Sequence, residues 1–118
     1  MDDECLFVDD PLQAYLAELK KIAPLDRKEE IECMRRIRTE DEHAEDARKR
    51  LLEANLHMVV TIVERYPCDP ARILDLIQKG NCGLLRATQN LHDSSAADDF
   101  SGYATPFIEH AIAEASSV

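Results

Sequence analysis

The chain has 118 residues, of which 24 are acidic and 14 are basic, so its formal net charge is −10. This length allows one domain with a hydrophobic core and is too short for two. The negative field repels phosphate, and because every lysine and arginine lies at or before Arg86, the C-terminal third is a poor candidate for gripping DNA or RNA.

The first predicted element follows an acidic leader over residues 1–9. Asp10 is a suitable cap and Pro11 a suitable first residue for a helix, because the missing N–H of proline would be unpaired there anyway. Apolar residues then recur at helical spacing as far as Ile22, and Pro24 ends the segment. We therefore expect residues 10–118 to form a single helical domain that begins with this helix.

Two capping signals predict the next two helices. Asp26 and Glu29 make a capping box for a helix that carries Ile31, Met34 and Ile37 on one face. Thr39 and Glu42 repeat the signal and predict a third helix that runs to Tyr66. Asn55 lies on the most apolar part of that helix, where we expect a buried amide bonded to nearby backbone.

The fourth predicted helix restarts at Asp69 and Pro70 and carries an apolar stripe at helical spacing. The stripe consists of Ile73, Leu76, Ile77, Gly80, Leu84 and Ala87. Gly80 and Gly83 each cost about 1 kcal/mol relative to alanine in a helix interior. They indicate either a close approach between helices or a short break between two helices.

The last predicted segment follows a polar loop, "HDSSAADD", and places apolar residues along one helical face up to Ala115. Pro106 interrupts it, so a second start with Thr105 as cap and Pro106 as first residue is a plausible alternative. No strand-like alternation occurs anywhere. The predicted fold class is therefore all-α, a compact bundle of about five helices.

The residues with reactive side chains form no recognisable catalytic or metal-binding pattern. The four cysteines, Cys5, Cys33, Cys68 and Cys82, lack the paired spacing of a zinc site. No histidine stands at a spacing that links it to a nucleophile or a metal set. We expect no enzyme activity, no metal and no cofactor. Because no apolar run approaches about 20 residues, we also expect a cytoplasmic protein without a membrane partner.

Three separated motifs resemble one protein family. These are "LLEANLHMVVTIVERY", "LDLIQKGNCGLLRATQNL" and "FSGYAT", in that order. Together they resemble region two of bacterial RNA polymerase sigma factors of the housekeeping type, and "DPLQAYLAELKKIAPLDRKEEIECMRRI" resembles the helical region that precedes it. The resemblance covers roughly residues 9–114. It implies a helical bundle in which one helix docks on the clamp coiled coil of core polymerase and a later helix opens promoter DNA.

The resemblance assigns the docking role to the segment "DLIQKGNCGLL", which is close to the family pattern "DLIQEGNIGLM". The implied partner-binding residues are Asp75, Gln78, Lys79, Asn81 and Leu85. Helical geometry agrees independently, because Asp75, Gln78, Lys79, Cys82 and Arg86 fall opposite the apolar stripe, with Asn81 and Leu85 at its edge. Lys79 stands where the family usually has glutamate, which reverses a charge in the implied interface and could redirect it to another partner.

The implied DNA-opening helix departs from the family. Pro106 and Phe107 replace its aromatic pair, and Asp98 and Asp99 lie near the place of a basic residue. Tyr103 and Phe107 are the aromatic remnants of a DNA-binding site, and we expect them to be in the core. Loss of phosphate contacts and of stacking both weaken binding to single-stranded DNA. We therefore expect weak or no nucleic-acid binding.

Three functions fit these observations. The leading hypothesis is a sigma-factor-like domain that binds the polymerase clamp in transcription initiation or its regulation, with promoter melting lost. The second is a sigma mimic that binds an anti-sigma factor or another regulator, and the third is a genuine promoter-binding domain. Residues 1–118 contain no helix-turn-helix for an upstream promoter element, so we expect them to represent a truncated or partial sigma-like chain.

Overall fold

The structure is a computed structural model that describes residues 11–67, 69–91 and 99–116. These described residues form six α-helices and one 3₁₀ turn, without a strand, which confirms the all-helical prediction. In chain order they are α2 (Pro11–Leu19), α3 (Arg27–Thr39), α4 (Ala44–Ala54), α5 (Leu56–Val63), η1 (Pro70–Arg72), α6 (Ile73–Gln89) and α7 (Phe100–Ser116). None of the described helices combines the length and apolarity needed to cross a membrane.

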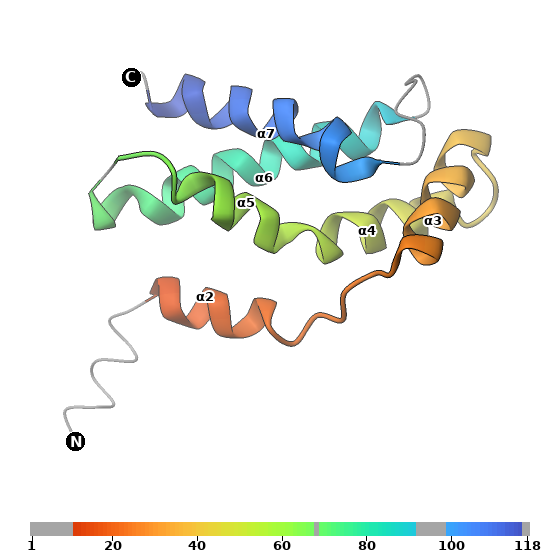
Figure 1. Cartoon of the computed structure of the whole chain (residues 1–118), viewed down its shortest axis with the longest axis horizontal. Coiled ribbons are helices and arrows are strands. Elements are labelled where there is room, and N and C mark those ends of the chain that lie inside the picture. The colour runs from red at the N-terminus through yellow and green to blue at the C-terminus, as the bar shows by residue number, and fades with distance from the viewer. Residues whose placement is uncertain (1–10, 68, 92–98, 117–118) are drawn as a thin grey trace.

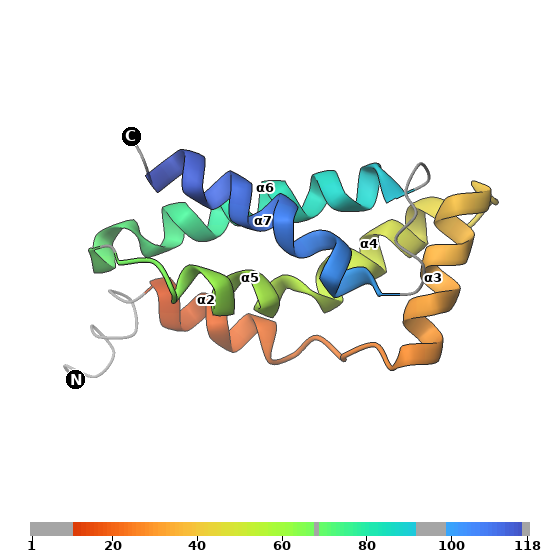
Figure 2. The same cartoon turned by 45° about the horizontal axis from the view of Figure 1, so that its top comes forward.

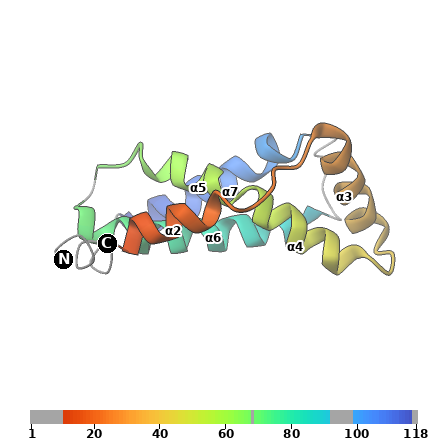
Figure 3. The same cartoon turned by 90° about the horizontal axis from the view of Figure 1, so that it is seen from below.

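The helices form a bundle whose long elements run side by side. Figure 1 shows α4 and α5 end to end through the middle, with α6 and α7 antiparallel to each other. Helix α3 crosses one end of the bundle in both views (Figures 1 and 2), and α2 lies alongside α5 and α6 (Figure 3). The centre is fully buried and is made by side chains from several helices, including Met34, Leu51, Leu76, Leu84, Phe100 and Ile112.

The closest packing in the bundle is between α6 and α7, and glycine permits it. A Cβ atom on Gly83 would lie 2.9 Å from the carbonyl carbon of Phe107 and 3.0 Å from the Cα of Ile108, which are backbone atoms of α7. A Cβ on Gly80 would lie 2.6 Å from a methyl carbon of Val59. Because α6 is continuous through both glycines, the predicted close approach is confirmed and the predicted break is wrong.

The predicted third helix is interrupted at Asn55, which separates α4 from α5. The Asn55 side-chain Nδ2 donates to the Leu51 carbonyl at 2.8 Å, while its backbone N–H donates to the Leu52 carbonyl at 3.1 Å. The amide therefore takes the acceptor that the backbone would use in a continuous helix, as polar side chains in helices can do. The expected amide-to-backbone bond is confirmed, but the expected uninterrupted helix is not, and α5 ends at Val63 instead of Tyr66.

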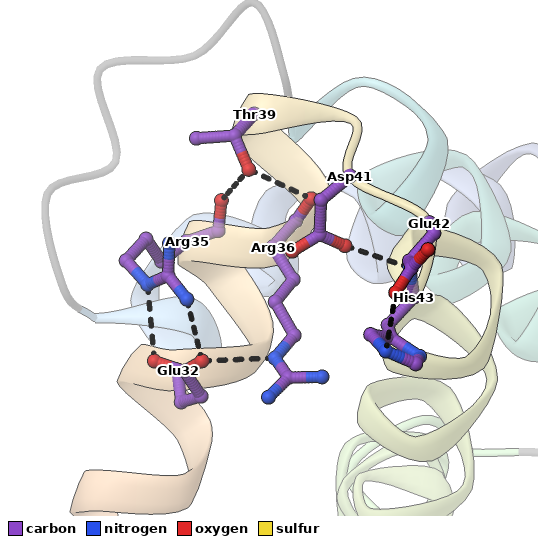
Figure 4. Close-up of polar contacts among 7 residues, drawn as sticks. All are labelled: Glu32, Arg35, Arg36, Thr39, Asp41, Glu42 and His43. Carbon is purple, nitrogen blue, oxygen red and sulfur yellow. Dashed lines mark hydrogen bonds and ion pairs between the residues drawn. The ribbon is translucent and has the colours of Figure 1, made fainter.

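The corner between α3 and α4 also differs from the prediction (Figure 4). Thr39 does not cap α4: it is the last residue of α3, and its hydroxyl donates back to the Arg35 carbonyl at 3.1 Å. Glu40 then adopts a left-handed conformation with φ 50° and ψ 43°, which ends α3. The carboxylate of Asp41 accepts the His43 N–H at 2.8 Å just before α4 begins. The prediction of a helix start at Thr39 is wrong because a threonine hydroxyl can bond backbone groups at either end of a helix.

The predicted helix starts that depend on capping residues and prolines agree better with the structure. The capping box of α3 is confirmed, since Asp26 accepts the Glu29 N–H at 2.8 Å and Glu29 accepts the Asp26 N–H at 3.0 Å. Pro11 opens the described part of α2 as expected, whereas its predicted cap, Asp10, lies outside the described residues. The α-helix ends at Leu19 and continues to Ile22 only as tighter turns. The expected restart after Asp69 takes the form of η1, and α6 follows it.

Helix α7 is continuous from Phe100 to Ser116 with Pro106 inside it. The alternative start at Thr105 is therefore wrong, and the Thr105 hydroxyl instead donates to the Ser101 carbonyl at 2.7 Å. Pro106 has no N–H, so the carbonyl of Gly102 lacks its usual backbone donor one turn later. The predicted "HDSSAADD" loop falls largely on residues 92–98, which lie outside the described residues.

A charged cluster on α3 provides a pH-dependent prediction (Figure 4). Glu32 accepts hydrogen bonds from Arg35 at 2.7 and 3.0 Å and from Arg36 at 2.8 Å, and these bonds lower the pKa of its carboxyl from 4.5 to about 2. Because the pKa is lower in the folded state, the stabilisation is complete above about pH 4.5 and is lost as the pH falls toward 2. We expect an NMR titration of the Glu32 carboxyl to give a midpoint well below 4.5.

The matched control for this titration is Arg35→Ala combined with Arg36→Ala, which removes both donors and should return the Glu32 midpoint toward its ordinary range. A midpoint in the parent chain that equals that of the double variant would contradict the assignment.

Candidate docking face on helix α6

Helix α6 has one side packed into the bundle and one side open to solvent. Its buried residues are Leu76, Ile77, Gly80, Gly83, Leu84, Ala87 and Thr88. Its exposed residues are Asp75, Gln78, Lys79, Cys82, Leu85, Arg86 and Gln89, and we call these seven the α6 face. This division follows from the apolar stripe in the sequence, because a helix turns about 100° per residue and so brings the stripe to one side.

An apolar side chain stands on the α6 face. Leu85 is 43% exposed and is the exposed large hydrophobic residue of the described chain. It borders a groove of about 500 Å³ between α4 and α6, which Leu52 and Thr88 also line. Arg48 on the rim of this groove is held by ion pairs to Glu40 and Glu45, both at 2.6 Å. The sequence pattern of α6 does not predict that Arg48 and Leu52 of α4 lie near Leu85, because only the packing of α4 beside α6 brings them there.

Asn81 does not lie with the other predicted partner-binding residues. It is half-buried, and its Nδ2 donates to the hydroxyl of Tyr15 on α2 at 3.2 Å. Its Oδ1 is buried, and within the described part of the chain it has no hydrogen-bond partner. The structure therefore brings Asp75, Gln78, Lys79 and Leu85 together on the α6 face and places Asn81 beneath α2, where it supports the contact between two helices.

Two of the seven residues of the α6 face, Lys79 and Arg86, are cations. Lys79 and Arg86 line a hollow of about 320 Å³ between α6 and α7, together with Cys82 of α6 and Glu114 of α7. Neither Lys79 nor Arg86 forms an ion pair within the described residues. Arg72 precedes them, 3.8 Å from the Asp75 carboxylate, and donates to the Ala115 carbonyl at 3.4 Å. An exposed helix with these groups can bind a complementary protein surface.

Tyr103 and Phe107, the predicted remnants of a DNA-binding site, lie on α7 and are partly buried. The rings of Tyr103 and Phe107 contact each other, with centroids 5.1 Å apart and planes inclined at 53°. Both are partly buried and pack against the hydrophobic core. Arg65 forms an ion pair with Glu109 of α7 at 3.7 Å, so this cation is already paired.

Within the described residues, no group of three or more histidine, cysteine, aspartate or glutamate side chains is placed to hold a metal ion. Of the four cysteines, Cys33 is half-buried and Cys82 exposed, and both are free thiols. Burial raises the pKa of the Cys33 thiol above its ordinary value.

Comparison with known proteins gives two family matches and several similar chains. The sigma-70 region 2 family matches residues 51–116, and the sigma-70 factor region 1.2 family matches residues 10–43. The RNA polymerase sigma factor SigA of Clostridium acetobutylicum is 43% identical over 112 residues, which cover 95% of this chain and 29% of that protein. The RNA polymerase sigma factor SigA of a Bacillus species is 41% identical over 108 residues, covering 92% of this chain and 28% of that protein.

These matches place the described helices in family terms. The region 1.2 match covers α2 and α3. The region 2 match covers the C-terminal end of α4 and all of α5, α6 and α7, and so includes the α6 face. The chain spans under a third of the length of the SigA proteins that it resembles. Because the region 2 match alone covers more than half of the chain, the protein belongs to the sigma-70 family.

Proposed function

We propose that this chain is a sigma-factor-like protein-binding domain that docks on core RNA polymerase and acts in transcription initiation or its regulation. The observation that carries the proposal is the joint exposure of Asp75, Gln78 and Leu85 on one helix, within the motif that resembles the family's docking segment. The proposed contact surface on the polymerase is the clamp coiled coil. Residues 10–118 act as one domain in this proposal, after an acidic leader.

Promoter melting is lost in the proposed function. Helix α7 carries no lysine or arginine, so it offers phosphates no fixed cation. Tyr103 and Phe107 are packed against each other and the core, so stacking on an unpaired base would require them to leave these contacts. Each lost stacking residue removes about 1–3 kcal/mol of binding per base. We expect no salt-sensitive binding to single-stranded promoter DNA.

The docking proposal predicts that Gln78→Ala and Leu85→Ala each weaken binding to purified core RNA polymerase by about fivefold or more. Both side chains are exposed, so neither substitution should change the free energy of unfolding by more than about 0.5 kcal/mol. The affinities can be measured with the intact chain and immobilised polymerase. The control is Lys28→Ala, which removes an exposed side chain from α3.

Alkylation of cysteines gives a second measurement on the same complex. Cys82 lies within the α6 face, whereas Cys33 lines a separate cleft between α3 and α4. We expect polymerase to protect the Cys82 thiol from iodoacetamide without changing the modification of Cys33. If the two alanine variants bind like the parent and Cys82 remains reactive in the complex, docking occurs elsewhere on the chain.

Lys79 supports a second candidate function. It is an exposed cation without an ion pair in the described residues, at a position where the family pattern has glutamate. A sigma mimic that binds an anti-sigma factor or another regulator would use the same α6 face with this altered charge. Co-purification from a lysate separates the two functions, since recovery of a small regulator without polymerase subunits would contradict the first.

A further inference from the structure

Asn81 lies at the edge of the α6 face, and its amide is only half satisfied. The Nδ2 group donates to the Tyr15 hydroxyl of α2 at 3.2 Å, whereas the buried Oδ1 has no hydrogen-bond partner among the described residues. Turning the amide over would let Oδ1 accept from the hydroxyl and would leave Nδ2 without a partner instead. Either orientation keeps an unpaired polar group under α2, which is unfavourable.

Helix α2 covers this amide and is held to the bundle lightly. It has nine residues, and none of them is fully buried. A helix of this length is only marginally stable in water by itself, so its contacts with the bundle maintain it. Its inward side is half-buried against the core and consists of Leu12, Tyr15, Leu16 and Leu19. Because these contacts are partial, α2 can leave α6 (Figure 3) more easily than a helix with a fully buried side.

The chain that follows α2 is anchored independently of α2. Arg50 of α4 donates to the Ala23 carbonyl at 2.9 Å and to the Pro24 carbonyl at 3.5 Å. The capping box of Asp26 and Glu29 then starts α3 directly after this connector. The connector therefore has a fixed end, about which α2 can swing without unfolding α3 or α4.

Release of α2 would add Asn81 to the exposed residues beside it. Asn81 stands three residues after Gln78 and four before Leu85, so the three side chains lie on one side of α6. Gln78 and Leu85 are already exposed. With α2 away, both groups of the Asn81 amide could bond water or a partner, and the α6 face would extend to this edge.

We propose that α2 is an autoinhibitory cover of the α6 face, seated over Asn81 in the free chain and released when a partner docks on Gln78, Asn81 and Leu85. The inference rests on the proposed docking function and adds the regulation of that face. A partner that bonds the Asn81 amide binds only the released form, so its apparent affinity falls as the seated fraction rises. The Tyr15 hydroxyl is the contact that biases this equilibrium toward the seated form.

Tyr15→Phe tests the cover, because it removes the hydroxyl and keeps the ring. Loss of this hydrogen bond should raise the released fraction and tighten binding of the intact chain to immobilised core RNA polymerase about fivefold. Hydrogen exchange of the α2 amides should accelerate by a similar factor in the free variant, and in the parent it should accelerate when polymerase binds.

The matched control is Tyr66→Phe, which makes the same chemical change at a half-buried tyrosine. The Tyr66 hydroxyl has no hydrogen bond within the described residues, so this variant should leave the affinity within about twofold. Circular dichroism melts verify that both variants fold.

The outcomes separate the cover from the docking function. If the parent binds polymerase and Tyr15→Phe binds equally or more weakly, or Tyr66→Phe tightens binding as much, the cover is wrong although docking stands. Exchange of the α2 amides that is unchanged or slower in the complex would also overturn the cover, because α2 would then stay seated. If only Tyr15→Phe binds, or if both bind with the expected changes, the cover is supported. If neither binds, the proposed function and its regulation both fail.

Discussion

Gly83→Ala is expected to lower the free energy of unfolding by about 3 kcal/mol, which is a large fraction of the stability of a small domain. The added methyl group would lie 2.9 Å from the Phe107 carbonyl carbon and 3.0 Å from the Ile108 Cα. Both are backbone atoms of α7, so relief requires the two helices to separate, and no rotation of a side chain can provide it. Urea denaturation followed by circular dichroism measures the effect.

The matched control is Gly102→Ala, which makes the same chemical change on α7. The nearest atoms to a Cβ there belong to the exposed carboxylate of Asp99, a flexible side chain that also accepts the Gly102 N–H at 3.1 Å and would have to shift. Alanine is favoured over glycine within helices by about 1 kcal/mol, which offsets a weakened Asp99 cap of similar size, so this variant should be about as stable as the parent. Equal stability of Gly83→Ala and Gly102→Ala would show that α6 and α7 are not in contact at Gly83.

Pro106→Ala is expected to change stability in the opposite direction, raising the free energy of unfolding by about 2 kcal/mol. Proline is about 3 kcal/mol less favourable than alanine within a helix, because it lacks a backbone donor and crowds the preceding turn. Part of the gain is offset by the greater freedom of the unfolded alanine chain, about 0.4–1 kcal/mol. Pro106 is exposed, so its replacement removes no core contact.

The control for this substitution is Pro11→Ala. Pro11 is the first residue of α2, where the missing N–H has no partner to lose, so its replacement should change stability little. Thermal and urea unfolding should therefore show a higher free energy of unfolding for Pro106→Ala and little change for Pro11→Ala. A Pro106→Ala variant that is less stable than the parent would mean that the backbone geometry imposed by Pro106 is required for packing.

These two substitutions should not act independently. Pro106 immediately precedes Phe107, whose carbonyl faces Gly83 across the tightest contact between α6 and α7. An added backbone hydrogen bond at residue 106 in the Pro106→Ala variant would change the backbone next to this carbonyl, so the cost of Gly83→Ala should differ between the two backgrounds. The contact matters for docking because it holds the buried side of α6, and thereby fixes which residues of α6 reach the solvent.

Features that depend on neighbouring residues of one helix could be predicted from the sequence. The all-helical class and the capping box of Asp26 and Glu29 rest on local periodicity and local hydrogen bonds. The exposure of Asp75, Gln78 and Lys79 also follows, since about 100° of rotation per residue separates them from the apolar stripe. Leu85 and Asn81 both fall at the edge of the stripe, where the rotation alone does not distinguish an exposed residue from a half-buried one. The close approach at Gly83 was one of two alternatives, because glycine permits both a break and a contact.

Features that depend on contacts between distant residues were decided only by the tertiary structure. Asn81 matches the family's docking motif, yet it is tied to Tyr15, 66 positions earlier in the chain, because α2 lies over that edge of α6. The break at Asn55 and the role of Thr39 depend on which of several backbone groups each polar side chain bonds, and packing selects among them. The sequence thus determined which side of α6 is polar, and the packing of α2, α4 and α7 around it determined which of those residues a partner can reach.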